Sequence, residues 1–174
     1  MHYDCDILVI GAGPAGTIAA ATAHKEGKNV LIVEKTQFPR FVIGESLLPS
    51  SMHHFEHAGF LKAIEDKKFE KKFGARFIRG EEVCLFDFSE NFTPGWTYTY
   101  QVPRSEFDKV MADEIEKRGV PIWYNTEVLD VKFNGMDSTT TIKKQDGSLS
   151  EISARFIIDA SGYGRVLPRL LNLD

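Results

Sequence analysis

The fold of this chain is decided by the stretch Asp6-Ile-Leu-Val-Ile-Gly11-Ala-Gly-Pro-Ala-Gly16. Within residues 6–10, the four residues after Asp6 form a continuous aliphatic run, which is typical of a strand buried on both faces of a parallel sheet. Pro14 then opens a predicted helix that reaches Glu26 and ends before Gly27. Residues 29–33 repeat the aliphatic pattern, so the first 33 residues predict a right-handed strand–helix–strand unit.

The three glycines of this stretch have the spacing Gly-x-Gly-x-x-Gly in the position where a dinucleotide-binding turn needs it. Gly11 allows the tight turn, Gly13 lets a pyrophosphate approach the backbone, and Gly16 permits close contact between helix and strand. Free backbone N–H groups at the start of the helix favour an anion there. Glu34 follows Gly16 by eighteen residues, where an acid accepts hydrogen bonds from ribose hydroxyls. An acid at this position disfavours a ribose 2′-phosphate, but the motif alone does not separate NAD from FAD.

Length and composition describe an ordinary globular chain. It has 174 residues, 43% of them hydrophobic, and its formal net charge is −4, which excludes the basic excess of a nucleic-acid-binding domain. The uncharged stretch 7–23 is interrupted by glycine and proline and follows Asp4 and Asp6, so it predicts neither a signal peptide nor a membrane span. Two cysteines without metal or disulfide spacing favour a cytoplasmic protein. His53 and His57 have no third ligand nearby, so we expect no metal site.

Several later motifs stand in the order seen in flavin-dependent halogenases and their p-hydroxybenzoate-hydroxylase-type monooxygenase relatives, and the chain resembles that family over almost its whole length. After the glycine motif these are Glu34-Lys35, Phe38-Pro-Arg-Phe41, Gly44-Glu-Ser-Leu-Leu-Pro49, Val102-Pro-Arg-Ser-Glu-Phe-Asp108 and Ala154-Arg-Phe-Ile-Ile-Asp-Ala-Ser-Gly162. The resemblance implies an α/β fold with a Rossmann-like parallel sheet of the glutathione-reductase type that binds FAD.

The remaining patterns give the expected organisation along the chain. Residues 1–73 are predicted to form the first segment of the FAD-binding domain, with a helix over 50–58. Alternating aromatic-rich segments predict antiparallel strands within 74–101, the start of an inserted substrate-domain sheet. Residues 102–174 form the second FAD-binding segment, with a helix from Ser105, a three-stranded β-meander over 126–153 and a separate buried strand at 156–158.

The resemblance also assigns residues to the cofactor. Arg40 and Arg104 are fixed cations that hold its phosphates or sugar, or else form surface ion pairs. Glu45 and Ser46 resemble the loop beside the isoalloxazine, and residues 159–162 resemble a second turn close to the nucleotide. The full predicted cofactor-binding set is Gly11, Gly13, Pro14, Ala15, Gly16, Glu34, Lys35, Arg40, Glu45, Ser46, Arg104, Asp159, Ala160, Ser161 and Gly162.

Lys72 is the candidate catalytic residue. Lys72-Phe-Gly-Ala-Arg-Phe77 resembles the halogenase segment whose lysine receives hypohalous acid formed at the flavin. Its ammonium can hydrogen-bond that oxidant, or its free amine can form a haloamine. The alternative is that Lys72 belongs to the charge run 67–72, which is typical of a solvated face.

The resemblance therefore implies a halogenase-like FAD-dependent monooxygenase that oxidises an aromatic or electron-rich small molecule. The resemblance also implies a separate flavin reductase as a partner, since halogenase relatives receive reduced flavin from one. The chain has no second Gly-x-Gly-x-x-Gly motif for NAD(P)H, which is consistent with that implication. A geranylgeranyl-reductase-like flavoprotein ranks second, since those enzymes tend to carry Cys-Gly where residues 43–46 are Ile-Gly-Glu-Ser. A non-catalytic FAD-binding fragment and a nicotinamide dehydrogenase are further alternatives. The family's later Gly-Asp and Trp-x-Trp-x-Ile-Pro motifs are missing, so we expect the parent protein to continue beyond residue 174.

Overall fold

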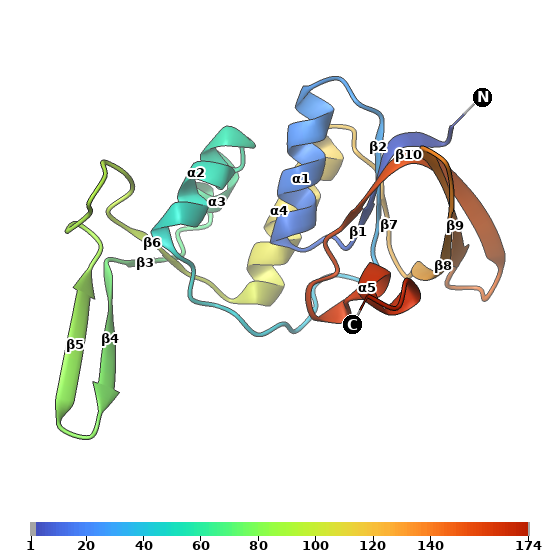
Figure 1. The fold of residues 1–174 in the computed structure, drawn as a ribbon. Coiled ribbons are helices and arrows are strands. Elements are labelled where there is room, and N and C mark those ends of the chain that lie inside the picture. The colour runs from blue at the N-terminus through green and yellow to red at the C-terminus, as the bar shows by residue number, and fades with distance from the viewer. Residues whose placement is uncertain (1–2, 174) are drawn as a thin grey trace.

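The computed structural model describes residues 3–173, and Figure 1 shows their arrangement around one main sheet. Within these residues the sheet has six strands in the order β7-β2-β1-β10-β9-β8. Their bounds are β1 (Cys5–Ile10), β2 (Val30–Val33), β7 (Ile122–Trp123), β8 (Glu127–Asn134), β9 (Asp137–Lys143) and β10 (Leu149–Asp159). The pairs β7–β2, β2–β1 and β1–β10 are parallel, whereas β10–β9 and β9–β8 are antiparallel. The predicted α/β class with a mostly parallel sheet is confirmed.

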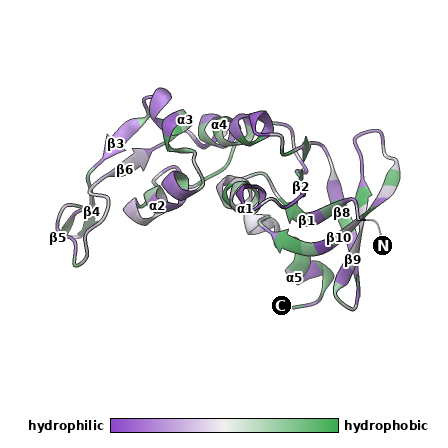
Figure 2. Ribbon diagram, turned by 90° about the horizontal axis from the view of Figure 1, so that it is seen from above, coloured by the Kyte–Doolittle hydropathy of each residue, from purple (hydrophilic) through white to green (hydrophobic). Residues whose placement is uncertain are grey.

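Helices cover one face of the parallel strands. Helix α1 (Pro14–Lys25) packs against β1, β2 and helix α4 (Arg104–Lys117), and α2 (Pro49–His57) and α3 (Leu61–Asp66) extend this layer away from the sheet (Figure 1). The buried side chains Val9 and Ile32 of the strands join Phe55 and Phe107 of the helices in one core cluster. Figure 2 shows the hydrophobic colouring of the central strands that this layer covers.

The β-meander and the short helix α5 (Val166–Leu170) contribute to a second core on the opposite face. Leu8, Ile10 and Leu31 of the parallel strands pack there with Ile142 of β9 and Ile152 of β10. Because successive strand residues point to opposite faces, β1 supplies both cores. This explains why residues 7–10 are hydrophobic without interruption.

The structure corrects one detail of the predicted meander. Its third strand and the predicted strand 156–158 are one continuous strand, β10, of eleven residues. The first part of β10 pairs with β9, from Leu149 to Ala154, and the part from Ala154 to Asp159 pairs with β1. Both halves have strand periodicity, and no turn residue separates them, so one strand passes from the antiparallel to the parallel part of the sheet.

Two small two-stranded sheets lie on the far side of α2. β3 (Glu70–Lys72) pairs with β6 (Thr99–Gln101), and Ser46 forms an isolated bridge to Gln101. β4 (Gly74–Arg79) and β5 (Glu82–Asp87) form a hairpin that extends away from the rest of the chain in Figure 1. These small sheets bring the loop around Ser46 next to Lys72.

None of the helices between residues 3 and 173 combines the length and the hydropathy that are needed to cross a bilayer.

Candidate functional site

The glycine motif forms a tight turn that packs against the end of β10. Gly11 follows β1 with a φ of +101°, a conformation that side chains other than glycine rarely adopt. A Cβ atom there would lie 2.7 Å from the Ala160 carbonyl oxygen, and a Cβ on Gly16 would overlap the Gly11 carbonyl oxygen. Gly11 and Gly16 are therefore required by the protein's own packing, as the sequence predicted for the turn and for the helix–strand contact.

Gly13 differs from these two glycines. It has a φ of −69° and a ψ of −178°, and a Cβ there would meet only the Arg40 Nη2 atom, at 3.5 Å. No side chain caps α1, and no acidic residue occupies its first turn. The N–H groups of Ala15 and Gly16, behind Pro14, belong to the first turn of the helix, where backbone donors lack intrahelical partners. The open side of Gly13 thus gives access to the positive end of α1.

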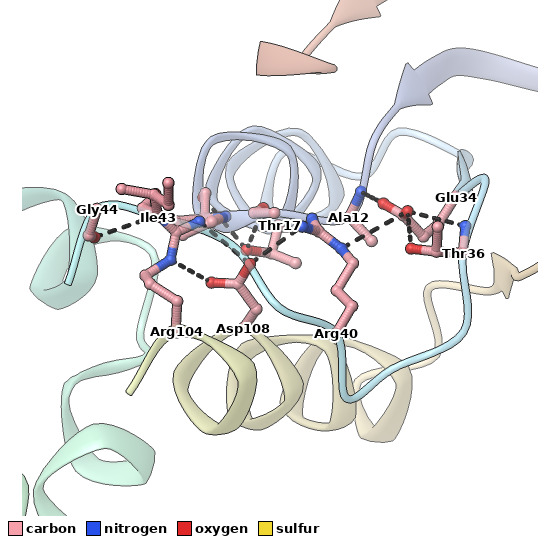
Figure 3. A network of polar contacts seen from close by, with 11 residues as sticks. Ala12, Thr17, Glu34, Thr36, Arg40, Ile43, Gly44, Arg104 and Asp108 are labelled. Carbon is pink, nitrogen blue, oxygen red and sulfur yellow. Dashed lines mark hydrogen bonds and ion pairs between the residues drawn. The ribbon is translucent and has the colours of Figure 1, made fainter. Parts of the chain in front are cut away.

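Glu34 joins this turn to the end of β2 (Figure 3). Glu34 is 6% exposed, and one oxygen of its carboxylate accepts a hydrogen bond from the Ala12 N–H at 2.9 Å. The other oxygen accepts from the Thr36 N–H at 3.0 Å and from the Thr36 hydroxyl at 2.8 Å. A carboxylate has about four acceptor positions, so three are used and one remains for a ligand hydroxyl.

A cavity of 470 Å³ lies beside Glu34. Its walls come from the turn after β1, the end of β2 and the turn after β10, and include Gly11, Glu34, Arg40, Ala160 and Ser161. The carboxyl ends of parallel strands, where chain direction changes, are the usual ligand position in open α/β sheets. The cavity therefore lies where the sequence predicted a nucleotide.

Lys35 lines this cavity and forms an exposed ion pair with Glu127. Its Nζ atom is 2.7 Å from the Glu127 Oε1 atom, and this hydrogen bond lowers the pKa of Glu127 below its ordinary value. The side chain of Lys35 is 68% exposed, so the pair is worth little to stability.

The second predicted turn, 159–162, is held by its own hydrogen bonds. The two Asp159 carboxylate oxygens accept from the N–H groups of Ser161 at 2.9 Å and Leu167 at 2.8 Å. The Ala160 N–H donates to the Ile10 carbonyl at 2.9 Å. Gly162 follows with a φ of +57°. Asp159 thus shapes the wall of the cavity, and Ala160 and Ser161 line it.

Arg40 and Arg104 meet at Asp108, a residue that sequence reasoning missed as part of the site (Figure 3). Arg104 donates from Nε to Asp108 Oδ1 at 2.8 Å and from Nη2 to Oδ2 at 3.1 Å. The Arg40 Nη2 atom lies 3.6 Å from Asp108 Oδ2, and its Nε atom lies 3.7 Å from Glu34 Oε1. The i, i+4 spacing of Arg104 and Asp108 in a predicted helix was the signal that could have found this pair.

The hydrogen bonding of the Arg40 guanidinium shows whether these residues fit a dinucleotide. The Arg40 Nε atom is buried, yet it has no hydrogen-bond partner among residues 3–173. Buried donors in native proteins are nearly always paired. An unpaired guanidinium N–H beside an uncapped helix N-terminus and an acid with one vacant acceptor position fits the diphosphate and ribose of FAD.

Lys72 and Ser46 form a second group, separate from the walls of the cavity. The Lys72 Nζ atom donates to the Ser46 hydroxyl at 2.6 Å and lies 5.2 Å from the centre of the Phe88 ring. The neighbouring Glu45 has an exposed side chain, and its carbonyl accepts from the Val102 N–H at 2.8 Å. Arg104 links the two groups, because its Nη1 atom donates to the carbonyls of Ile43 and Gly44, each at 3.3 Å.

Other parts of the surface offer less. A hollow of 610 Å³ between α3 and α4 is lined mainly by exposed residues. Several of them form ion pairs, such as Lys62–Asp66 and Lys117–Glu114, and none is a predicted site residue. Among residues 3–173, no group of three or more His, Cys, Asp or Glu side chains has an arrangement that could hold a metal ion.

Comparison with known proteins identifies relatives over nearly the whole chain. The chain is 36% identical over 158 residues to tryptophan 2-halogenase from Chondromyces crocatus, covering 90% of this chain and 30% of that protein. The crystal structure of a flavoprotein/dehydrogenase from Cytophaga hutchinsonii superposes with a TM-score of 0.93 at 57% identity, covering 97% of this chain and 42% of the other. The flavin-dependent halogenase CmlS superposes with a TM-score of 0.89 at 34% identity, covering 97% of this chain and 31% of the other.

The chain therefore spans less than half the length of these relatives. A model of the FAD binding domain family matches residues 4–169, which include the glycine turn, Glu34, both arginines and the turn after β10. On this match and on the geometry of the turn, the chain belongs to the FAD binding domain family.

Proposed function

We propose that this chain is the FAD-binding part of a halogenase-like flavin monooxygenase that oxidises an aromatic or electron-rich small molecule. The observation that carries the proposal is the 2.6 Å contact between Lys72 Nζ and Ser46 Oγ. It brings the candidate catalytic lysine to the loop that the resemblance assigns to the isoalloxazine. The similarity to a tryptophan 2-halogenase and to CmlS supports the same chemistry.

The residues of the cavity and of the adjoining N-terminus of α1 would hold the adenosine diphosphate part of FAD. The first-turn N–H groups of α1 would donate to the diphosphate, which approaches over Gly13, and the Arg40 guanidinium would offset part of its negative charge. Glu34 accepts from a ribose hydroxyl. When bound and reduced, FAD supplies the electrons with which oxygen is converted into an oxidant.

Lys72 would act on that oxidant. Its ammonium donates a hydrogen bond to hypohalous acid and orients it toward the substrate. In the alternative route, the free amine attacks the halogen, the N–halogen bond forms as the halogen–oxygen bond breaks, and the departing hydroxide takes the amine proton as water. The Ser46 hydroxyl accepts a hydrogen bond from Lys72 Nζ and so fixes the position of this nitrogen in either route.

The test uses the whole protein with reduced FAD, oxygen, chloride or bromide, and a panel of phenols and pyrroles, with products analysed by mass spectrometry. We expect halide incorporation that Lys72→Ala abolishes without changing FAD affinity. Lys71→Ala is the matched control, because Lys71 lies next in β3 but contacts the Tyr98 ring at 4.2 Å instead of Ser46. Halogenation that persists in Lys72→Ala would contradict the role of this lysine.

A second candidate is a flavin-dependent dehydrogenase or reductase, including the geranylgeranyl-reductase type. The observation that favours it is the 57% identity to a structure described as a flavoprotein/dehydrogenase. In the same panel, substrate oxidation with an electron acceptor but without halide, or hydrogenation of an isoprenoid, would support this candidate. FAD binding without any turnover would support a non-catalytic FAD-binding protein.

Three further parts of the proposal concern the whole protein. Residues 74–101 open a substrate-domain sheet, because the β4–β5 hairpin exposes large apolar side chains such as Phe77 and Leu85 that suit further packing. A separate reductase supplies reduced flavin, a role that the resemblance to flavin-dependent halogenases supports. The cytoplasm is the proposed location, in keeping with two free cysteines.

A further inference from the structure

Asp108 is a fully buried carboxylate in the first turns of α4, and it lies between two arginines from different segments (Figure 3). Arg104, at the start of the same helix, engages both of its oxygens. Arg40, from the loop after β2, approaches one of them at 3.6 Å. A buried carboxylate is costly unless it is paired and hydrogen-bonded, and this one is paired on two sides.

The first consequence concerns Arg40. Its guanidinium is held between Glu34 at 3.7 Å and Asp108 at 3.6 Å, with Nη2 directed at Asp108 and Nε nearer Glu34. Nη2 also lies 3.5 Å from the place where a Cβ on Gly13 would be, in front of α1. Among residues 3–173, the ion pairs of Arg40 are with Glu34 and Asp108. With Asp108 removed, Nη2 would lose the carboxylate that holds it in front of Gly13, and the remaining pair with Glu34 would pull the guanidinium toward that carboxylate.

The second consequence concerns the loop that leads to Ser46. Arg104, fixed by both Asp108 oxygens, donates from Nη1 to the carbonyls of Ile43 and Gly44. Gly44 has a φ of +112°, and a Cβ there would approach Arg104 Nη1 to 3.1 Å. The guanidinium thus packs closely against this part of the loop, and Asp108 is the residue common to both arginine contacts.

We propose that Asp108 is a positioning residue for FAD: it holds Arg40 at the diphosphate position and, through Arg104, fixes the loop 43–46. Asp108 acts through the two arginines and does not itself face the cavity. The inference rests on FAD binding and not on the oxidation chemistry proposed above, so either can fail without the other.

The direction in which Asp108→Asn changes the affinity for a diphosphate separates a positioning role from simple electrostatic attraction. Arg40 and Arg104 balance Glu34 and Asp108, so this group of side chains is neutral. Asp108→Asn leaves one net positive charge, which by electrostatic attraction alone would tighten the binding of an anionic diphosphate. Positioning predicts weaker binding, because Arg40 loses the partner that aims it.

The experiment titrates the whole apoprotein with FAD and with ADP, which carries the diphosphate without the flavin. For Asp108→Asn we expect about tenfold weaker binding of both ligands, equivalent to about 1.4 kcal/mol. Asp113→Asn is the matched control, because it removes an exposed carboxylate paired with Lys109 on the same helix, and it should leave both affinities unchanged. Unchanged or tighter ADP binding by Asp108→Asn would overturn the proposal.

Two further variants separate positioning from a structural role. In an Arg40→Met background, Asp108→Asn should have no further effect on ADP affinity, whereas a structural role would give additive losses. Arg40→Lys keeps the positive charge but lacks the planar fork that reaches both acids, so it too should weaken ADP binding. Wild-type affinity in Arg40→Lys would overturn the proposal even if Asp108→Asn fails to fold.

Discussion

Replacing Gly13 by alanine should separate cofactor binding from folding. The other two glycines of the motif cannot accept a Cβ. A Cβ on Gly11 would lie 2.7 Å from the Ala160 carbonyl oxygen, and a Cβ on Gly16 would overlap the Gly11 carbonyl oxygen. At Gly13, a Cβ meets only Arg40 Nη2 at 3.5 Å, an ordinary van der Waals distance, and the backbone conformation suits any residue. The protein's own packing therefore does not need a glycine there, whereas a diphosphate approaching over α1 does.

Gly13→Ala should change the stability of the apoprotein little and the affinity for FAD strongly. In the apoprotein, a Gly→Ala change in compatible backbone stabilises by about 0.4–1 kcal/mol through the unfolded state. Loss of glycine at the N-cap of α1 costs a similar amount, so the free energy of unfolding should change by less than about 1 kcal/mol. In the complex, the methyl group displaces the diphosphate from at least one charge-assisted hydrogen bond, worth about 1.5–3 kcal/mol. FAD affinity should therefore fall roughly 10- to 150-fold.

Flavin fluorescence quenching measures the affinity, and urea denaturation of the apoprotein measures stability. Gly16→Ala is the contrasting variant, since it should lower the stability of the apoprotein itself. If Gly13→Ala binds FAD as tightly as the wild type, the diphosphate does not approach over this residue and the reasoning fails. If its apoprotein unfolds as easily as that of Gly16→Ala, the glycine is structural.

Three further predictions concern the rest of the chain. Burial raises the pKa of the Cys5 thiol to about 11, so a thiol reagent at neutral pH should modify the exposed Cys84 quickly and Cys5 only after unfolding. Burial also raises the pKa of Tyr100 from 10.0 to about 12, so the tyrosine ionises at lower pH in the unfolded chain than in the folded one. The free energy of unfolding, measured by circular dichroism, should therefore fall as the pH rises from 10 to 12, and it should fall less steeply in Tyr100→Phe. Phe107→Ala leaves a cavity at a position with no solvent exposure and should lower the free energy of unfolding by about 3–5 kcal/mol. Phe133→Ala, at an exposed position, should change it by less than about 0.5 kcal/mol; urea denaturation measures both.

Local patterns predicted the first unit of the fold, because each of its signals acts over a few residues. The aliphatic strands, the glycine turn and the helix that starts at Pro14 all occur as expected, and Glu34 ends β2 beside the turn. The continuity of β10 could not be predicted in this way. It depends on pairing with β9 and with β1, more than a hundred residues earlier, and strand periodicity alone does not show where a strand changes partner.

In the candidate site, too, local patterns predicted what lies within one short segment, and long-range contacts could not be predicted from them. The three glycines and the acid Glu34 that we propose for the nucleotide belong to one short segment. Arg40, Arg104 and Asp108, by contrast, meet only after α4 packs on α1. The contact between Lys72 and Ser46 depends on the pairing of β3 with β6 and on the bridge from Ser46 to Gln101. The charge run 67–72 favoured a solvated face for this lysine, and the tertiary pairing gives its ammonium a fixed partner.

The most direct test of the central claim is a crystal structure of the whole protein with FAD. We expect the diphosphate at the N-terminus of α1, within hydrogen-bonding distance of the N–H groups of Ala15 or Gly16 and of the Arg40 guanidinium. Glu34 should accept a hydrogen bond from the adenosine ribose in the 470 Å³ cavity. A dinucleotide bound elsewhere, such as in the hollow between α3 and α4, would contradict the assignment of the site.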